Sequence, residues 1–167
     1  ENNNTDNKYQ AIQNLIEFDP KLLLSELFVK FHAADIAEAL EEISNERCLT
    51  LFQNNPIKDT IEVFVLLTLQ KKETLFLSLK DTQKSKFIQE MEADDAIELL
   101  NEVQSKIPNT ISTLIKKLPK EKAEYLIELL SYEEGTAASI MNKEFISIPR
   151  NLTAEQALFR IKKQNPP

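Results

Sequence analysis

The chain has 167 residues, of which 42% are hydrophobic, so it can bury the core of one domain, or of one domain and a fragment of a second. Its formal net charge of −7 argues against nucleic acid as a partner, because phosphates require a basic surface. Gly135 is the only glycine, which excludes a glycine-rich phosphate loop, a dinucleotide-binding fingerprint and a nucleophile elbow. We therefore expect no enzymatic activity and no catalytic residues.

Cysteine content and hydropathy bear on the compartment. Cys48 is the only cysteine, so no internal disulfide can form, which fits a reducing compartment. Its apolar surroundings favour a buried, inert thiol over a reactive one. The longest apolar run, residues 63–69, is far shorter than the roughly 20 residues of a membrane span. No signal-peptide pattern opens the chain, and we expect a soluble piece that does not insert into a membrane.

The first half of the chain is expected to be helical after a polar start. Residues 1–8 are predicted to form a disordered tail. Helices are predicted for residues 9–17 and 21–31, where Asp19 is a candidate cap and Pro20 fits a first helical turn. Apolar periodicity and proline breaks predict further helices at about residues 35–43, 44–52, 57–64, 72–79, 82–90, 91–103, 107–118 and 120–130. Six phenylalanines are predicted to be core residues: Phe28, Phe31, Phe52, Phe64, Phe76 and Phe87.

Residues 91–103 combine a core-facing stripe with a group of carboxylates. Asp94, Asp95 and Glu98 gather at the helix start, and Asp94 lies one turn from Glu98. These three carboxylates are a candidate binding site for a hard cation. The alternative is helix capping, because Asp95 and Glu98 have capping-box spacing and acidic residues are favoured in a first turn. The stripe follows i, i+3, i+4, i+7 spacing and consists of Ala96, Leu99, Leu100 and Val103.

A similar pattern occurs earlier in the chain. Residues 34–43 align with residues 94–103, so that Asp35 and Glu38 match Asp95 and Glu98. A weaker copy of the apolar stripe lies in residues 123–130. Repeated short amphipathic helices predict a solenoid, in which each helix buries its stripe against its neighbours. The spacing looks irregular and by itself indicates no named repeat family.

The character of the sequence changes after Ser131. Residues 145–149 form a β-like run closed by proline, and Thr153 with Gln156 has the capping-box spacing of a helix through about residue 163. One strand followed by one helix cannot close a core. We therefore expect residues 142–167 to be the truncated β-α start of a second domain.

Three motifs resemble one known family: residues 32–37 (HAADIA), 91–96 (MEADDA) and 132–141 (YEEGTAASIM). They are similar to the cytoplasmic amino-terminal domain of the MgtE magnesium transporters and channels, followed by the start of their CBS domain pair. The third motif is the most specific, because it joins a helical domain to a CBS start. The resemblance covers about residues 25–164.

The resemblance implies an all-α fold, a right-handed superhelix or solenoid of about ten short helices over residues 9–131. A linker over residues 132–141 would lead into the truncated CBS start. Members of the family usually carry proline at the positions of Ala33 and Ala93, and two glycines near residues 138 and 139. These departures leave every acidic position in place.

The family also implies a function. Its amino-terminal domain faces the CBS domains across an acidic interface where Mg²⁺ binds. The resemblance carries Mg²⁺ ligation over to Asp94, Glu98 and Glu62, with Asp95 adjacent and better suited to capping. Glu98 stands where an aspartate is frequent. The implied partners are the CBS and transmembrane domains of the same transporter, as a homodimer, with this domain on the cytoplasmic side of the cell membrane. The implied role is to sense Mg²⁺ and gate its transport.

A scaffold without metal sensing is the alternative function. Similar short-helix superhelices occur in the flagellar rotor switch protein, where they bind partner helices. The CBS-like tail over residues 141–163 separates the two functions, because a rotor scaffold lacks it. His32, the only histidine, lies beside a helix start and is predicted to be a capping or packing residue, since borderline metals require several His or Cys ligands.

Overall fold

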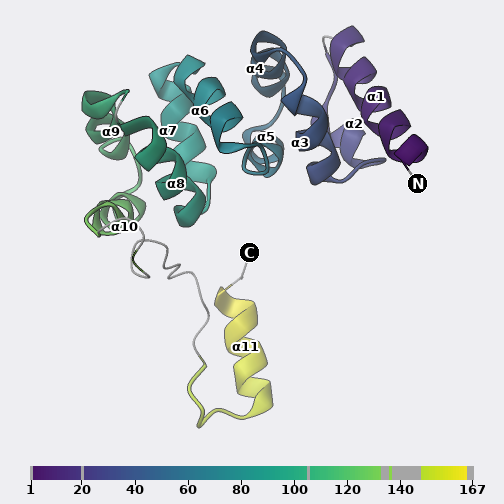
Figure 1. Cartoon of the computed structure of the whole chain (residues 1–167). Coiled ribbons are helices and arrows are strands. Elements are labelled where there is room, and N and C mark those ends of the chain that lie inside the picture. The colour runs from purple at the N-terminus through teal and green to yellow at the C-terminus, as the bar shows by residue number, and fades with distance from the viewer. Residues whose placement is uncertain (1, 20, 105, 133–135, 137–147, 165–167) are drawn as a thin grey trace.

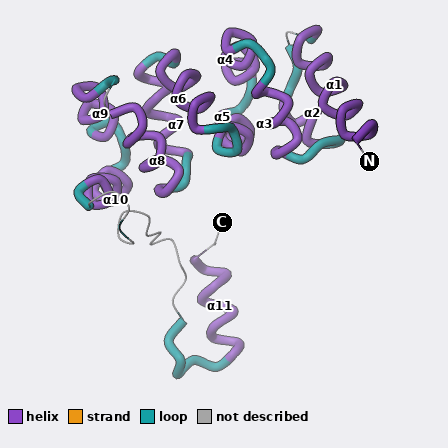
Figure 2. The backbone as a smooth tube through the Cα atoms, in the orientation of Figure 1, coloured by secondary structure: helices purple, strands orange, loops and turns teal. Residues whose placement is uncertain are grey.

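The computed structural model describes residues 2–19, 21–104, 106–132, 136 and 148–164. Within these residues the chain forms helices and no strand (Figure 2). The helices are α1 (Asn2–Phe18), α2 (Leu24–Phe28), α3 (Ala33–Glu41), α4 (Asn45–Asn54), α5 (Ile57–Phe64), α6 (Leu69–Ser78), α7 (Asp81–Glu90), α8 (Ala93–Gln104), α9 (Pro108–Ile115), α10 (Lys120–Leu130) and α11 (Ala154–Gln164). This confirms the all-α prediction for the described part of the chain.

Helices α1 to α10 form a stack of two layers (Figure 1). Helices α1, α3, α5, α7 and α9 pack in succession in one layer, and α4, α6, α8 and α10 pack in succession in the other. The first layer has helices that begin at positions 33, 57 and 81, and the second has helices that begin at positions 45, 69 and 93. Within each layer, consecutive helices thus begin the same number of residues apart in the sequence, and this number is the same in both layers. The last step, to positions 108 and 120, is slightly longer.

The structural period corrects the expectation of irregular spacing. The similarity between residues 34–43 and 94–103 joins α3 to α8, which lie in different layers, so it does not mark one repeat unit. The repeat is kept by the lengths of helices and turns rather than by shared residues. The sequence similarity between residues 34–43 and 94–103 therefore does not reveal the structural repeat.

The core runs continuously between the two layers. The stripe predicted for α8 is confirmed, since its four residues are at most 1% exposed. The rings of Phe52, Phe64 and Phe87 meet edge to face, with centroid distances of 6.2 Å and 5.1 Å. Cys48 is buried, as predicted, and burial raises the pKa of its thiol to about 11, which fits an inert thiol.

Basic side chains of the second layer hold the C-terminal ends of first-layer helices. Arg47 is the third residue of α4, and its guanidinium donates to the carbonyl oxygens of Ile16 (2.6 Å) and Asp19 (2.7 Å) at the end of α1. A helix leaves its last carbonyls without intrahelical partners, and a cation there also opposes the helix dipole. The third residues of α6 and α10 act alike: Lys71 donates to the carbonyls of Glu41 and Ile43 at the C-terminal end of α3, and Lys122 to those of Gln89 and Met91 at the C-terminal end of α7.

The N-terminal region differs from the prediction in two places. Helix α1 begins at Asn2, so the predicted disordered tail over residues 1–8 is wrong. A helix that is anchored further along gains one hydrogen bond for each residue it extends, which favours growth toward its start. Helix α2 begins at Leu24, and the Asp19 carboxylate instead accepts from the Lys21 N–H (2.9 Å) within a turn, so Asp19 does not cap α2.

The anchor of α1 is a pair of polar contacts with α3. The Lys8 ammonium lies 2.6 Å from the Asp35 carboxylate, and the Tyr9 hydroxyl donates to Glu38. The hydrogen bond from Lys8 lowers the pKa of Asp35, and the hydrogen bond with Glu38 raises the pKa of Tyr9 to about 12. Asp35 also accepts from the backbone N–H of His32, the N-cap of α3, which fits the capping or packing role expected near His32.

Helix α11 lies apart from the stack (Figure 1). Its predicted capping box is confirmed, because Thr153 and Gln156 exchange hydrogen bonds of 3.0 Å and 3.3 Å. Leu158 and Phe159 are exposed. Most of the predicted linker and β-like run falls in residues 133–135 and 137–147, outside the described residues, so the CBS start stays a prediction. No described helix is both long and apolar enough to cross a membrane.

Lys71 and Lys122, which donate to carbonyls at the ends of first-layer helices, are expected to stabilise the stack. Lys71→Met leaves the carbonyls after α3 without their charged donor, and we expect a loss of about 1–3 kcal/mol of unfolding free energy. Thermal unfolding measures this as a fall in Tm of several degrees. Lys58→Met, a change at an exposed lysine of α5, is the control and should leave Tm nearly unchanged. Equal effects of the two substitutions would contradict the capping role.

The Lys8–Asp35 pair predicts a pH dependence of stability. Because the folded-state pKa of Asp35 is lowered, its contribution is fully present above the unfolded-state value of about 3.9 and is lost as pH falls through the folded-state pKa. The Tm difference between the wild type and Asp35→Asn should therefore be positive at pH 7 and should shrink below pH 4. A difference that stays constant over this range would be inconsistent with the pair.

Candidate metal-binding edge on helix α8

The predicted carboxylate group lies in the first two turns of α8. Asp94 and Glu98 are exposed and one helical turn apart, while Asp95 is half-buried. The helix begins at Ala93, so Asp95 is its third residue rather than its N-cap, and a capping box that starts at Asp95 does not form. Asp94 Oδ1 accepts from the N–H of Asp95 at 3.0 Å. The acidic first turn thus combines a local hydrogen bond with side chains that face solvent.

Mutual repulsion is visible at Asp95. Burial raises the pKa of Asp95 first, and the negative charges of Asp94 and Glu98 raise it further, against the opposing charge of Lys72. Anionic charge is therefore concentrated at this edge. A divalent cation that approached from solvent would relieve that repulsion.

Helix α8 also departs from the capping pattern of its layer. The third residue is Arg47 in α4, Lys71 in α6 and Lys122 in α10, and each donates to the end of a first-layer helix. The third residue of α8 is Asp95. An ionised carboxylate has no proton to donate to carbonyls. At its third residue, α8 thus has an anion where the other three helices of this layer have a cation, and this anion lies beside Asp94 and Glu98.

Lys72 completes this edge and was missed by the sequence reasoning. Its ammonium lies 2.7 Å from Glu98 Oε2, and its side chain is only 6% exposed, whereas that of Glu98 is 53% exposed. A signal was present in the sequence. Lys72 shares the apolar face of α6 with Leu75 and Phe76, a place where a charged residue is uncommon.

The structure does not gather all four candidate ligands. Glu62 is exposed on α5, in the first layer, whereas Asp94, Asp95 and Glu98 lie on α8 in the second. Among the residues that the structure describes, no three Asp, Glu, His or Cys side chains are arranged to hold a metal ion. Metal ligation by the carboxylates of the α8 edge therefore stays a prediction.

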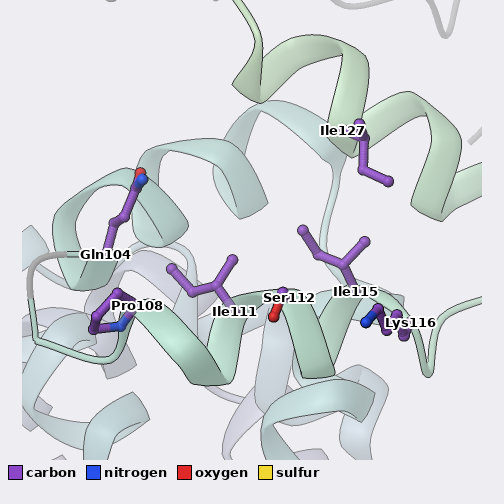
Figure 3. Close-up of a pocket in the computed structure, with 7 residues that line it drawn as sticks. All are labelled: Gln104, Pro108, Ile111, Ser112, Ile115, Lys116 and Ile127. Carbon is purple, nitrogen blue, oxygen red and sulfur yellow. The ribbon is translucent and has the colours of Figure 1, made fainter.

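A separate apolar groove lies between α9 and α10 (Figure 3). It has a volume of about 270 Å³ and contains no carboxylate in its lining. Ile111 and Ile115 of α9 face Ile127 of α10, which is 56% exposed. The groove is lined by Gln104, Pro108, Ile111, Ser112, Ile115, Lys116 and Ile127. It has no oxygen-rich character and suits apolar contacts rather than a cation.

Helices α1 to α10 thus define an all-helical, two-layer domain with an exposed acidic edge on α8. Its sequence matches the family model described as the MgtE intracellular N domain over residues 31–135, and the chain belongs to this family. No curated protein sequence matches it. Two solved structures have the same fold. The first is the soluble part of a magnesium transporter, with 21% sequence identity and a TM-score of 0.77.

The second is the cytosolic domain of the Mg²⁺ channel MgtE in complex with ATP, with 20% identity and a TM-score of 0.73. The two alignments cover 96% and 84% of this chain. The chain spans only 62% and 57% of the two solved chains. The fold is therefore that of a part of these two solved chains.

Proposed function

We propose that this chain is the Mg²⁺-sensing regulatory domain of a magnesium transporter or channel. One observation carries the proposal: α8 has a carboxylate at the position where α4, α6 and α10 have a capping cation, next to two exposed carboxylates one turn apart. Family membership supplies the context of magnesium transport. The domain would act on the cytoplasmic side of the cell membrane.

The residues at this edge fit Mg²⁺. Carboxylate oxygens are its preferred protein ligands, and the ion commonly keeps several waters and takes one or two carboxylates. Asp94 and Glu98 are the proposed ligands on α8, with Asp95 supporting them through its charge. Glu62 would serve a second, separate contact from α5. The other side of each contact would come from the CBS domains of the same transporter.

The regulation follows from charge. Two carboxylates about 6 Å apart repel by about 0.7 kcal/mol at the dielectric constant of water, so several pairs must act together to separate two domains. Bound Mg²⁺ would supply the positive charge that cancels this repulsion. A coupling of about 1–3 kcal/mol is typical between two sites in allosteric proteins. High Mg²⁺ would then favour a compact homodimer with a closed pore, and low Mg²⁺ a looser, conducting one.

A protein-interaction scaffold is the second candidate function. The α9–α10 groove and the exposed Ile127 favour it, because an apolar groove between helices can take apolar side chains of a partner helix. This function requires no Mg²⁺ response.

Thermal unfolding with Mg²⁺ separates the two functions. At a concentration about ten times the dissociation constant, a bound ligand adds about 1.4 kcal/mol, which corresponds to a rise in Tm of about 3–5 °C. We expect this rise for the wild type at millimolar Mg²⁺ and its loss in Asp94→Ala/Glu98→Ala. Ionic strength is held constant with K⁺, so that screening does not contribute.

The matched control removes two exposed carboxylates elsewhere. Glu121→Ala/Glu124→Ala on α10 changes the net charge by the same amount and should keep the Mg²⁺ response. Loss of the response in both double variants would indicate a general charge effect. A wild type that does not respond would favour the scaffold.

A further inference from the structure

Lys72 occupies a position that packing alone would fill with a small apolar residue. It is the fourth residue of α6, and the fourth residues of α4, α8 and α10 are Cys48, Ala96 and Ala123. The side chain of Lys72 is 6% exposed, so its ammonium has been largely withdrawn from water. That withdrawal is unfavourable unless the charge has a partner. Its partner is Glu98, at 2.7 Å.

The two members of this ion pair differ in exposure. Lys72 reaches Glu98 from the protein interior, whereas the Glu98 side chain is 53% exposed and open to solvent. A cation that arrives from solvent can therefore approach the same carboxylate from the opposite side. The two cations would then compete for one negative charge.

We propose that Lys72 is a built-in competitor of Mg²⁺ at Glu98 and sets the concentration at which this edge responds. The proposal rests on the proposed function, since it takes Glu98 as a ligand. A tethered ammonium is already in place and loses no translational freedom on pairing. Mg²⁺ must displace it or share its carboxylate, so the response shifts to higher Mg²⁺. When Mg²⁺ is low, the pair ties α6 to α8.

The test is a Mg²⁺ titration of the chain and of its Lys72→Met variant. Calorimetry and the change in Tm are the two readouts. Methionine keeps the apolar length of the side chain and removes the charge, and the half-exposed Glu98 stays solvated without its partner. We expect the apparent dissociation constant for Mg²⁺ to fall by about 3- to 5-fold. The double variant Lys72→Met/Glu98→Gln should lose this gain.

Lys84→Met is the matched control. Lys84 is the fourth residue of α7, is also buried, and lies 3.7 Å from Asp81 rather than beside Glu98. Its removal changes the net charge equally and should alter the Mg²⁺ constant by less than twofold. A gain of the same size in both variants would overturn the specific role of Lys72.

A second measurement needs no substitution. In NMR spectra of the wild type, the side-chain methylene next to the ammonium of Lys72 should shift along the Mg²⁺ titration, and that of Lys84 should not. Suppose that Mg²⁺ binding requires Asp94 and Glu98, but the Lys72 signal does not shift and Lys72→Met has the same Mg²⁺ dissociation constant as the wild type. Lys72 is then only structural, and this inference fails while the proposed function stands. If no variant responds to Mg²⁺, both the proposed function and this inference fail.

Discussion

Unsatisfied carbonyls at helix ends are the constraint on which this fold depends. Helices α3 to α10 have between 8 and 12 residues, so a large share of each helix lies within four residues of an end. In a two-layer stack these ends meet the neighbouring layer, where a carbonyl without a donor is destabilising. Arg47, Lys71 and Lys122 supply charged donors across the layers.

The candidate site lies where this rule is broken. At α8 the capping position holds Asp95, and the charged contact at this step comes instead from Lys72, a buried residue one position later in α6, which pairs with Glu98 of α8 within the same layer. Proteins commonly depart from local consistency at functional sites and compensate nearby. Here the compensation is the Lys72–Glu98 pair. It replaces a cap on backbone carbonyls by a contact between side chains, one of which stays open to solvent.

Local signals predicted the helices well because caps and prolines act within a few residues. Thr153 opens α11, as its capping-box spacing with Gln156 predicted, and Ser44 at the start of the predicted helix over residues 44–52 caps α4. Helix α2 was misplaced, because the carboxylate of Asp19 serves a turn and tertiary packing decides where so short a helix begins. The start of α1 depends on contacts with α3, 27 residues away for Lys8 and Asp35, which no local pattern contains.

The acidic residues of the site could be predicted from the sequence, but the pairing of Glu98 with a lysine could not. Asp94 and Glu98 share a helix face by spacing alone. The neutralising charge beside Glu98 comes from Lys72, 26 residues earlier on α6, and becomes visible only when α6 and α8 pack against each other. That charge changes the physical picture of the edge. An acidic cluster without a nearby lysine would bind a divalent cation at a lower concentration, because nothing competes for its carboxylates. A cluster that contains a lysine binds the divalent cation only when that ion is the better partner of the carboxylate.

A ligand shifts a conformational equilibrium only by its difference in affinity between two states. If Lys72 competes with Mg²⁺ as proposed, it contributes to that difference, because the ion pair would be present in one state and relieved in the other.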